Sequence, residues 1–367
     1  MIRSRLGRFA ALGVIAALTL TGCAIEDEAL EEVDETAPAA EEEAAVEDDV
    51  FRHPLTGEEV DPATVTGPAI MAKIDHENRP YVNLQRADIV WQQVIPQNGT
   101  RFIAIWHSDI PEEVAYVRSF RPHDLYMATP FGGIMASTGL FQGVVPYLEA
   151  LGQAGVRNYV WDYRTEEDRD LWRVADKAYA AASSVVFNAL DAHEINSELA
   201  PPQQYFQYSS DPAEASAVVD GEAISAVTAY FSQSKTNNYM TSSWQWDAAE
   251  GVFKKVFVDG TPVVVESGEQ LSATNLVIIS VEHDDTVGQP TARMQNGSGP
   301  AWVATGGKIM EVDWEKGALA DPIKLTYDGT DQEVLLTPGK TWILVFPGDA
   351  STAQTAGWGG PGGIEYQ

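Results

Sequence analysis

A single cysteine, Cys23, limits the ways in which this 367-residue chain can be stabilised. One cysteine allows no disulfide within the chain, so any folded region must rest on its hydrophobic core alone. A chain of this length can bury enough apolar surface to do so. If Cys23 is modified as its surroundings indicate, the chain has no thiolate left for catalysis.

The segment before Cys23 has the layout of a bacterial export signal. Three arginines precede a short apolar run at 9–20, and Leu20-Thr21-Gly22-Cys23 matches the lipobox, in which the cysteine receives diacylglycerol and palmitate. An apolar run of about twelve residues is too short to span a bilayer. We therefore expect 1–22 to be a lipoprotein signal peptide. Lipidated Cys23 would then anchor the protein to the extracytoplasmic face of the cell membrane, where two acyl chains suffice for stable anchoring.

Residues 23–50 are predicted to be an acidic, disordered tether. Between positions 24 and 50 the sequence has 13 acidic residues, no basic residue and no aromatic residue, with Pro38 in the middle. Such a segment buries too little apolar surface to fold, and its charges repel one another. The alternative, a solitary acidic helix, is disfavoured by Pro38 and by the same repulsion.

The rest of the chain is also acidic. Without the leader and the tether, 41 of the 54 acidic residues and 20 of the 23 basic residues remain, which gives a net charge of −21. A protein that binds phosphate backbones needs a basic face, so no nucleic acid is expected as a partner. A local group of arginines on such an acidic chain is therefore a candidate for a specific role, either in binding or in an ion-pair network.

The fold class expected is α+β, with an N-terminal α/β layered domain followed by a mostly antiparallel β domain. Strands are predicted at 70–74, 88–95, 102–106, 113–117 and 133–135, and helices at 144–151 and 168–182. The N-terminal domain is expected over 51–205. Turn-punctuated strands then indicate a β-rich domain over 215–347, and the Gly-rich tail 348–367 is expected to be disordered.

Several short segments occur in the order seen in the YerB-like bacterial lipoproteins. In the first half they are Pro54-Leu55-Thr56-Gly57, Ile74-Asp75 with Arg79-Pro80, Ala87-Asp88-Ile89-Val90, Thr100-Arg101-Phe102 and Val117-Arg118-Ser119-Phe120-Arg121-Pro122. In the second half they are Ser272-Ala273-Thr274-Asn275, Asn296-Gly297-Ser298-Gly299, Gly307-Lys308, Trp314-Glu315-Lys316 and Pro338-Gly339-Lys340-Thr341-Trp342.

The chain thus resembles this two-domain family of unknown function over roughly 54–347. The Pro-His-Asn segment of the family pattern is missing after Arg173, so any contribution of that histidine would be lost here. The resemblance implies a cell-envelope lipoprotein and supplies no activity to transfer.

An arginine group is the best candidate for a ligand site. Arg118 and Arg121 bracket Ser119 at the end of a predicted strand, and Arg101 begins another. Ligands of α/β sheets gather at the carboxyl ends of strands, and the planar guanidinium fork suits carboxylate or phosphate. Asp75 and His107 also stand at predicted strand ends and complete the set. The competing interpretation is a buried ion-pair network of Arg118 or Arg121 with Asp75, Asp88 or Asp124.

The sequence contains no complete motif for phosphate-loop binding, for a nucleophile elbow or for a metal site. Gly339-Lys340-Thr341 lacks the first glycine of a phosphate loop, and Met135 stands where a Gly-x-Ser-x-Gly elbow needs glycine. Six scattered histidines give no metal-ligand spacing. No metal, cofactor or catalytic residue is therefore predicted. Trp244 and Trp246 share one strand face and could stack on a sugar, but a role as core aromatics of a β domain is the favoured interpretation.

The function predicted is non-enzymatic binding of a cell-wall ligand or an envelope protein. The alternative is an enzyme that acts on an anionic wall polymer or its precursor, with Arg118 and Arg121 orienting the anion and Asp75 or His107 as general base. A transport-type solute receptor is weakened by the lack of two similar α/β lobes. Convergence of these side chains in space would separate the first two hypotheses.

Overall fold

The computed structural model describes residues 50–76, 80–139, 142–161, 168–175, 184–353 and 359–367. Cys23, the leader and nearly all of the predicted tether lie outside these residues. Residues 49–367 form one compact unit. Within the described residues, no helix combines the length and the hydropathy needed to cross a membrane.

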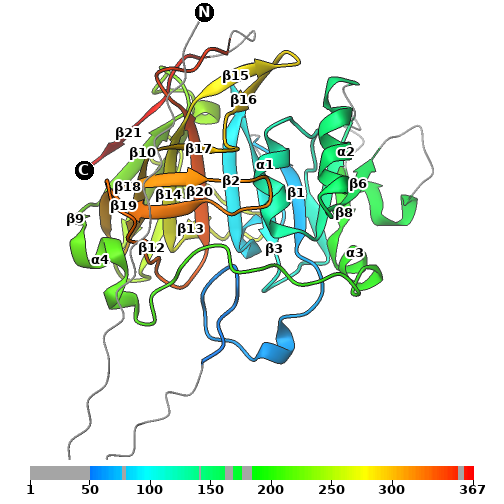
Figure 1. The fold of residues 1–367 in the computed structure, drawn as a ribbon, viewed down its shortest axis with the longest axis horizontal. Coiled ribbons are helices and arrows are strands. Elements are labelled where there is room, and N and C mark those ends of the chain that lie inside the picture. Colours follow the sequence, from blue (N-terminus) through cyan, green and yellow to red (C-terminus); the bar gives the residue numbers. More distant parts are fainter. Residues whose placement is uncertain (1–49, 77–79, 140–141, 162–167, 176–183, 354–358) are drawn as a thin grey trace, which may run out of the picture. The chain divides into compact units, whose positions relative to one another are not determined.

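An eleven-stranded mixed sheet forms the centre of this unit (Figure 1). Its strand order is β19-β18-β17-β14-β20-β2-β3-β1-β5-β6, with β9 paired to β18. The bounds are β1 Ile70–Asp75, β2 Ile89–Ile95, β3 Gly99–Trp106, β5 Ile134–Thr138, β6 Arg157–Trp161, β9 Glu222–Ala223, β14 Asn275–Val281, β17 Gly297–Thr305, β18 Lys308–Lys316, β19 Lys324–Tyr327 and β20 Thr341–Pro347. The central strands are buried on both faces, as their continuous apolar runs require.

The two halves of the chain share this sheet. Strand β2, from the first half, pairs in parallel with β20, from the second, in the register Ile89↔Thr341 to Gln93↔Val345. The hydrophobic clusters on the two faces of the sheet likewise contain residues of both halves. The segment between 205 and 215 therefore does not separate two independent cores, because strand pairing and side-chain packing continue across it.

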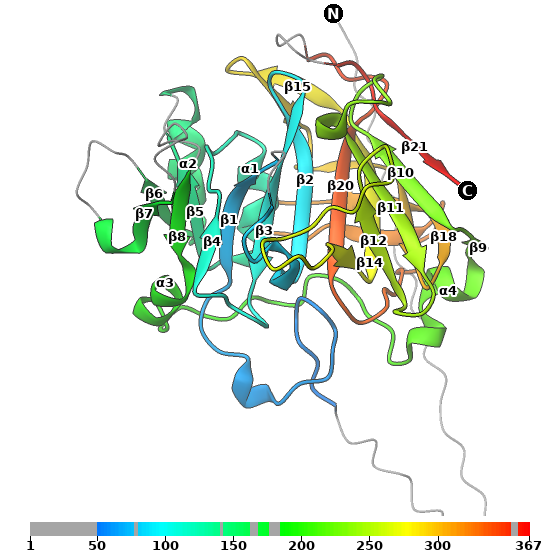
Figure 2. The same cartoon turned by 180° about the vertical axis from the view of Figure 1, so that it is seen from behind.

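Helices α1, α2 and α4 cover one face of the sheet, and smaller sheets together with α3 cover the other (Figures 1 and 2). The helices are α1 Asp124–Ala128, α2 Val145–Gln153, α3 Ala189–Ile195 and α4 Ser216–Asp220, and α1 and α2 pack on the face of Met71 and Trp91. The opposite face carries a five-stranded sheet, β13 Ser272–Ala273, β12 Val252–Val256, β11 Thr241–Asp247, β10 Ala226–Tyr230 and β21 Gly363–Tyr366. It also carries the three-stranded sheet β4 Glu113–Ala115, β8 Val185–Asn188 and β7 Trp172–Val174. Trp244 is buried between the two sheets, which confirms its core role.

Two local expectations are wrong. The helix expected over 168–182 is replaced by a 3₁₀ turn at Arg169–Leu171 and by β7, which pairs with β8; residues 176–182 lie outside the described residues. Pairing with β8 overrides the helical spacing here, because Trp172 and Val174 also fit a period of two. The tail is not disordered at its end, since β21 pairs with β10 from Val227↔Tyr366 to Tyr230↔Gly363.

A β-hairpin, β15 His283–Thr286 and β16 Gln289–Ala292, lies above the carboxyl end of β2 (Figures 1 and 2). Its two turn residues have positive φ angles, 49° at Val287 and 73° at Gly288, as in a type I′ turn. A β-branched residue is strained in this region, whereas asparagine and glycine are favoured there.

Replacing Val287 by asparagine is expected to raise the free energy of unfolding by about 1 kcal/mol, because the backbone strain is relieved. The opposite control is Gly288→Ala. No atom lies within 4 Å of the added methyl group, so only the positive φ makes this change destabilising. Urea unfolding measures both variants. A loss of stability in Val287→Asn would contradict the strain argument.

Candidate functional site

Six strands of the main sheet point the same way, so their carboxyl ends meet along one edge. β14, β20 and β2 are mutually parallel, as are β1, β5 and β6, and β3 runs antiparallel between β2 and β1. Asp75 ends β1 at this edge, and Arg101, near the start of β3, is its cross-strand neighbour. Gln93 of β2 is the neighbour of Arg101 on the other side. Such an edge is where open α/β sheets bind ligands.

The chain around Arg118 enters the sheet between two diverging strands. β1 and β5 pair only as far as Ala72↔Ala136. Beyond that point Arg118 N–H donates to the carbonyl of Lys73 at 2.7 Å, and Thr138 N–H donates to the carbonyl of Arg118 at 2.9 Å. A bridge between Ser119 and Thr138 continues the insertion. The backbone therefore fixes Arg118 and Ser119 at the carboxyl edge.

Asp75 is shared by two arginines. Its Oδ1 lies 3.4 Å from Nε of Arg101, and its Oδ2 lies 3.0 Å from Nε of Arg118. The side chain of Arg101 is 7 % exposed, whereas that of Arg118 is 20 % exposed. Arg118 is thus the more accessible of the two guanidinium groups.

A second carboxylate, Asp124 at the start of α1, lies buried beside this pair. Its Oδ1 accepts hydrogen bonds from Nζ of Lys73 at 2.5 Å and from Nε2 of Gln93 at 3.1 Å. Its Oδ2 accepts from the backbone N–H of Arg121 at 2.7 Å. The side chains of Lys73 and Asp124 are both fully buried. Burial lowers the pKa of Lys73 to about 8 in spite of the opposing effect of Asp124.

Arg121 completes the group. Its Nη1 donates to the carbonyl of Phe120 at 2.9 Å and more weakly to that of Ser119 at 3.4 Å. Burial lowers the pKa of Arg121, and burial followed by the nearness of Arg121 lowers the pKa of Arg101 to about 10. The attraction of Asp75 opposes this shift. The two guanidinium groups are therefore close enough to repel each other.

The structure brings together five of the six predicted residues: Asp75, Arg101, Arg118, Ser119 and Arg121. Two further polar residues of this cluster were not predicted: Lys73 and Gln93. The alternation in β1 contains a signal for the first of these. Lys73 stands two residues before Asp75 and so lies on the same face of the strand.

His107 lies at the opposite edge of the sheet. His107 follows Arg101 by six positions, which corresponds to about 20 Å along a strand. Its Nδ1 accepts from Nε2 of His53 at 2.9 Å, and its Nε2 donates to the carbonyl of Gly67 at 3.2 Å. This assignment follows because Nδ1 of His53 accepts from the backbone N–H of Leu55, so its proton is on Nε2. His107 is therefore not part of the arginine cluster.

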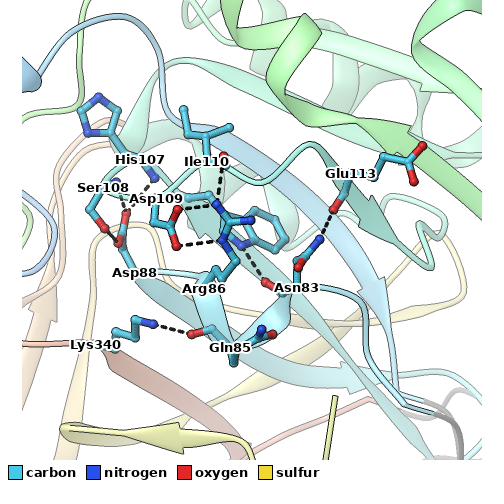
Figure 3. Close-up of polar contacts among 11 residues, drawn as sticks. Asn83, Gln85, Arg86, Asp88, His107, Ser108, Asp109, Ile110, Glu113 and Lys340 are labelled. Atoms are coloured by element: carbon cyan, nitrogen blue, oxygen red, sulfur yellow. Dashed lines mark hydrogen bonds and ion pairs between the residues drawn. The ribbon is translucent and has the colours of Figure 1, made fainter. Parts of the chain in front are cut away.

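Figure 3 shows the surroundings of His107 at that opposite edge. Asp88 accepts from the backbone N–H groups of His107 and Ser108 at 2.7 Å and 2.9 Å, and from the hydroxyl of Ser108. Asp88 thus stabilises the turn after β3 and is not a partner of Arg118 or Arg121. Arg86 and Asp109 form an exposed two-point ion pair nearby.

The arginine cluster can hold an oxyanion, since its accessible groups are hydrogen-bond donors. Among the described residues, no group of three or more histidine, cysteine or carboxylate side chains is placed to hold a metal ion. The two histidines next to the cluster, His76 and His123, are buried, and burial lowers the pKa of both, that of His76 to about 3. Recognition of a negative charge is the chemistry that this arrangement supports.

Comparisons with known proteins give one consistent result. Family models match residues 55–192 as the N-terminal domain, and residues 227–343 as the C-terminal domain, of a protein of unknown function (DUF3048). The chain is 26 % identical to "Putative lipoprotein YerB" of Bacillus subtilis (strain 168) over 81 % of its length and 86 % of that protein. The crystal structure of YerB protein from Bacillus subtilis matches with a TM-score of 0.67 and 22 % identity, over 86 % of this chain and 99 % of that one.

The fold and the two matched segments define the class of protein, in which two family domains share one mixed sheet. The chain belongs to the DUF3048 family, as the resemblance to the YerB-like lipoproteins predicted.

Proposed function

We propose that this protein is a membrane-anchored lipoprotein of the extracytoplasmic face, and that its folded unit binds an anionic ligand of the cell envelope without transforming it. The lipobox at Cys23 and the name of the relative, "Putative lipoprotein YerB", support the anchor. The acidic segment 24–50 acts as the spacer between membrane and folded unit, with a reach on the order of 30 Å.

One observation carries the binding proposal: Arg101 and Arg118 share a single carboxylate at the carboxyl edge of the sheet, beside Arg121. Partly buried arginines repel one another, and an incoming oxyanion would relieve that repulsion. The enzymatic alternative is less well supported, because His107 lies about 20 Å from the arginines. Each carboxylate oxygen of Asp75, the other proposed general base, already lies next to an arginine nitrogen.

The test uses calorimetry to measure the binding of inorganic phosphate to the full-length protein in micelles of a neutral detergent. Arg118→Ala is expected to weaken binding more than tenfold, equivalent to about 1.4 kcal/mol. The matched control is Arg86→Ala, which removes an arginine that is also paired with one carboxylate but lies at the other edge. Equal affinities of wild type and Arg118→Ala, or equal losses in the two variants, would contradict the proposal.

A further inference from the structure

The charges at the carboxyl edge indicate what kind of anion fits there. The described side chains of the cluster carry four positive charges, on Lys73, Arg101, Arg118 and Arg121, and two negative charges, on Asp75 and Asp124. All six lie within or beside one face of β1 and β3. A buried excess of positive charge is costly unless a ligand balances it.

The two carboxylates are already committed. Asp124 accepts hydrogen bonds from Lys73, from Gln93 and from the backbone of Arg121, so its negative charge balances Lys73. Asp75 lies between Arg101 and Arg118. The side chain of Arg121 donates only to backbone carbonyls and forms no ion pair within the described residues. Arg121 is therefore the cation of the cluster that lacks a carboxylate of its own.

Two of these arginines also have buried donor atoms without a hydrogen-bond acceptor among the described residues. Nη1 of Arg101 and Nε of Arg121 are buried and make no hydrogen bond to described residues. Arg101 is 94 % buried, since 6 % of its surface is exposed. An oxyanion with several oxygens could accept hydrogen bonds from both of these buried donors at once.

The number of oxygens and the charge separate the anion classes. A phosphate monoester carries close to two negative charges at pH 7 and three terminal oxygens, so it can accept from two guanidinium forks at once. A carboxylate or a phosphodiester has one charge and two free oxygens. The first class matches both the unsatisfied donor atoms of Arg101 and Arg121 and the excess positive charge.

We propose that the carboxyl-edge site binds a dianionic phosphate group, either a phosphate monoester or the terminal phosphate of a diphosphate, in preference to a carboxylate or a phosphodiester. This inference rests on the proposed function and specifies its ligand. Arg101 and Arg121 hold the phosphate oxygens, and Arg118, whose side chain is more exposed than that of Arg101, remains partly open to solvent.

The experiment compares methyl phosphate, dimethyl phosphate, acetate and sulfate as calorimetric probes of the full-length protein at pH 7.5. Methyl phosphate is expected to bind at least tenfold more tightly than dimethyl phosphate or acetate. Sulfate, a dianion with four oxygens, is expected to bind within about threefold of methyl phosphate. Affinities of dimethyl phosphate and methyl phosphate within twofold of each other would overturn the preference for a dianion and leave anion binding itself intact.

A pH series and two variants complete the test. Between pH 5 and pH 8 methyl phosphate gains its second charge near pH 6, so its affinity should rise about tenfold while that of sulfate does not rise. Arg121→Gln should lose at least tenfold for methyl phosphate, and Arg86→Gln, outside the site, should lose nothing. Failure of all four probes to bind, or undiminished binding by Arg121→Gln, would overturn both this inference and the proposed function.

Discussion

Replacing Asp124 by alanine is expected to lower the free energy of unfolding by about 3–5 kcal/mol, because the fully buried amine of Lys73 must then either keep its charge without a carboxylate or give up its proton. Part of this loss should be recovered at pH 9. The pKa of Lys73 is already lowered to about 8 by burial, and without Asp124 the amine would lose its proton at a still lower pH.

Urea unfolding of four proteins measures this effect. The double variant Lys73→Met with Asp124→Leu removes both charges and should be far more stable than Asp124→Ala. The control Asp109→Ala breaks the exposed ion pair with Arg86 and should cost less than about 1 kcal/mol. A cost below about 1 kcal/mol for Asp124→Ala would show that the Lys73–Asp124 pair does not stabilise the fold.

Acid is expected to destabilise the protein well above the pH range in which carboxylates titrate. Burial lowers the pKa of five histidines. The pKa is about 4 for His53, His107 and His283 and about 3 for His76, and that of His123 is also lowered. The unfolded chain binds protons at these positions from about pH 6.5 downward, whereas the folded chain does not. The contribution of these neutral histidines to stability is therefore fully present above pH 6.5. It is lost as the pH falls towards their pKa values in the folded state.

The size of this loss follows from the pH interval. At pH 5 each wholly buried histidine such as His76 or His283 contributes a loss of about 2 kcal/mol, at about 1.4 kcal/mol per pH unit below 6.5. Unfolding free energies at pH 7.5, 6 and 5 measure it, and His283→Gln should show a shallower decline than wild type. A free energy of unfolding that stays constant from pH 7.5 to pH 5 would contradict the buried, neutral state of these histidines.

The residues of the site were predictable because strand ends are visible in sequence. Apolar runs end at Asp75 and begin near Arg101, and the end of one strand lies beside the start of its neighbour when the two strands are antiparallel, as β1 and β3 are. Lys73 was not predicted, since its place inside a buried strand is tolerated only through Asp124, which is 51 positions away. His107 was misplaced because the sequence does not reveal that β3 runs antiparallel to β1.

The joining of the two halves was also beyond sequence patterns. β2 and β20 are separated by more than half the chain, and no local periodicity encodes their pairing. The prediction at β7 was wrong for a related reason. Its residues have helical spacing, but they form a strand because β8 is available as a partner. Elements with long and strongly periodic sequences, such as β1, β2, β3 and α2, lie close to their predicted positions.

Diffraction from crystals soaked in tungstate, a tetrahedral dianion, tests most directly whether the carboxyl edge is an anion site. The prediction is an anomalous peak with its oxygens within about 3 Å of guanidinium nitrogens of Arg101 and Arg121, a normal distance for charge-assisted hydrogen bonds. The same soak of Arg121→Gln crystals should give no peak there. Tungstate bound only elsewhere on the protein, or a peak that persists in Arg121→Gln, would contradict the assignment of this site.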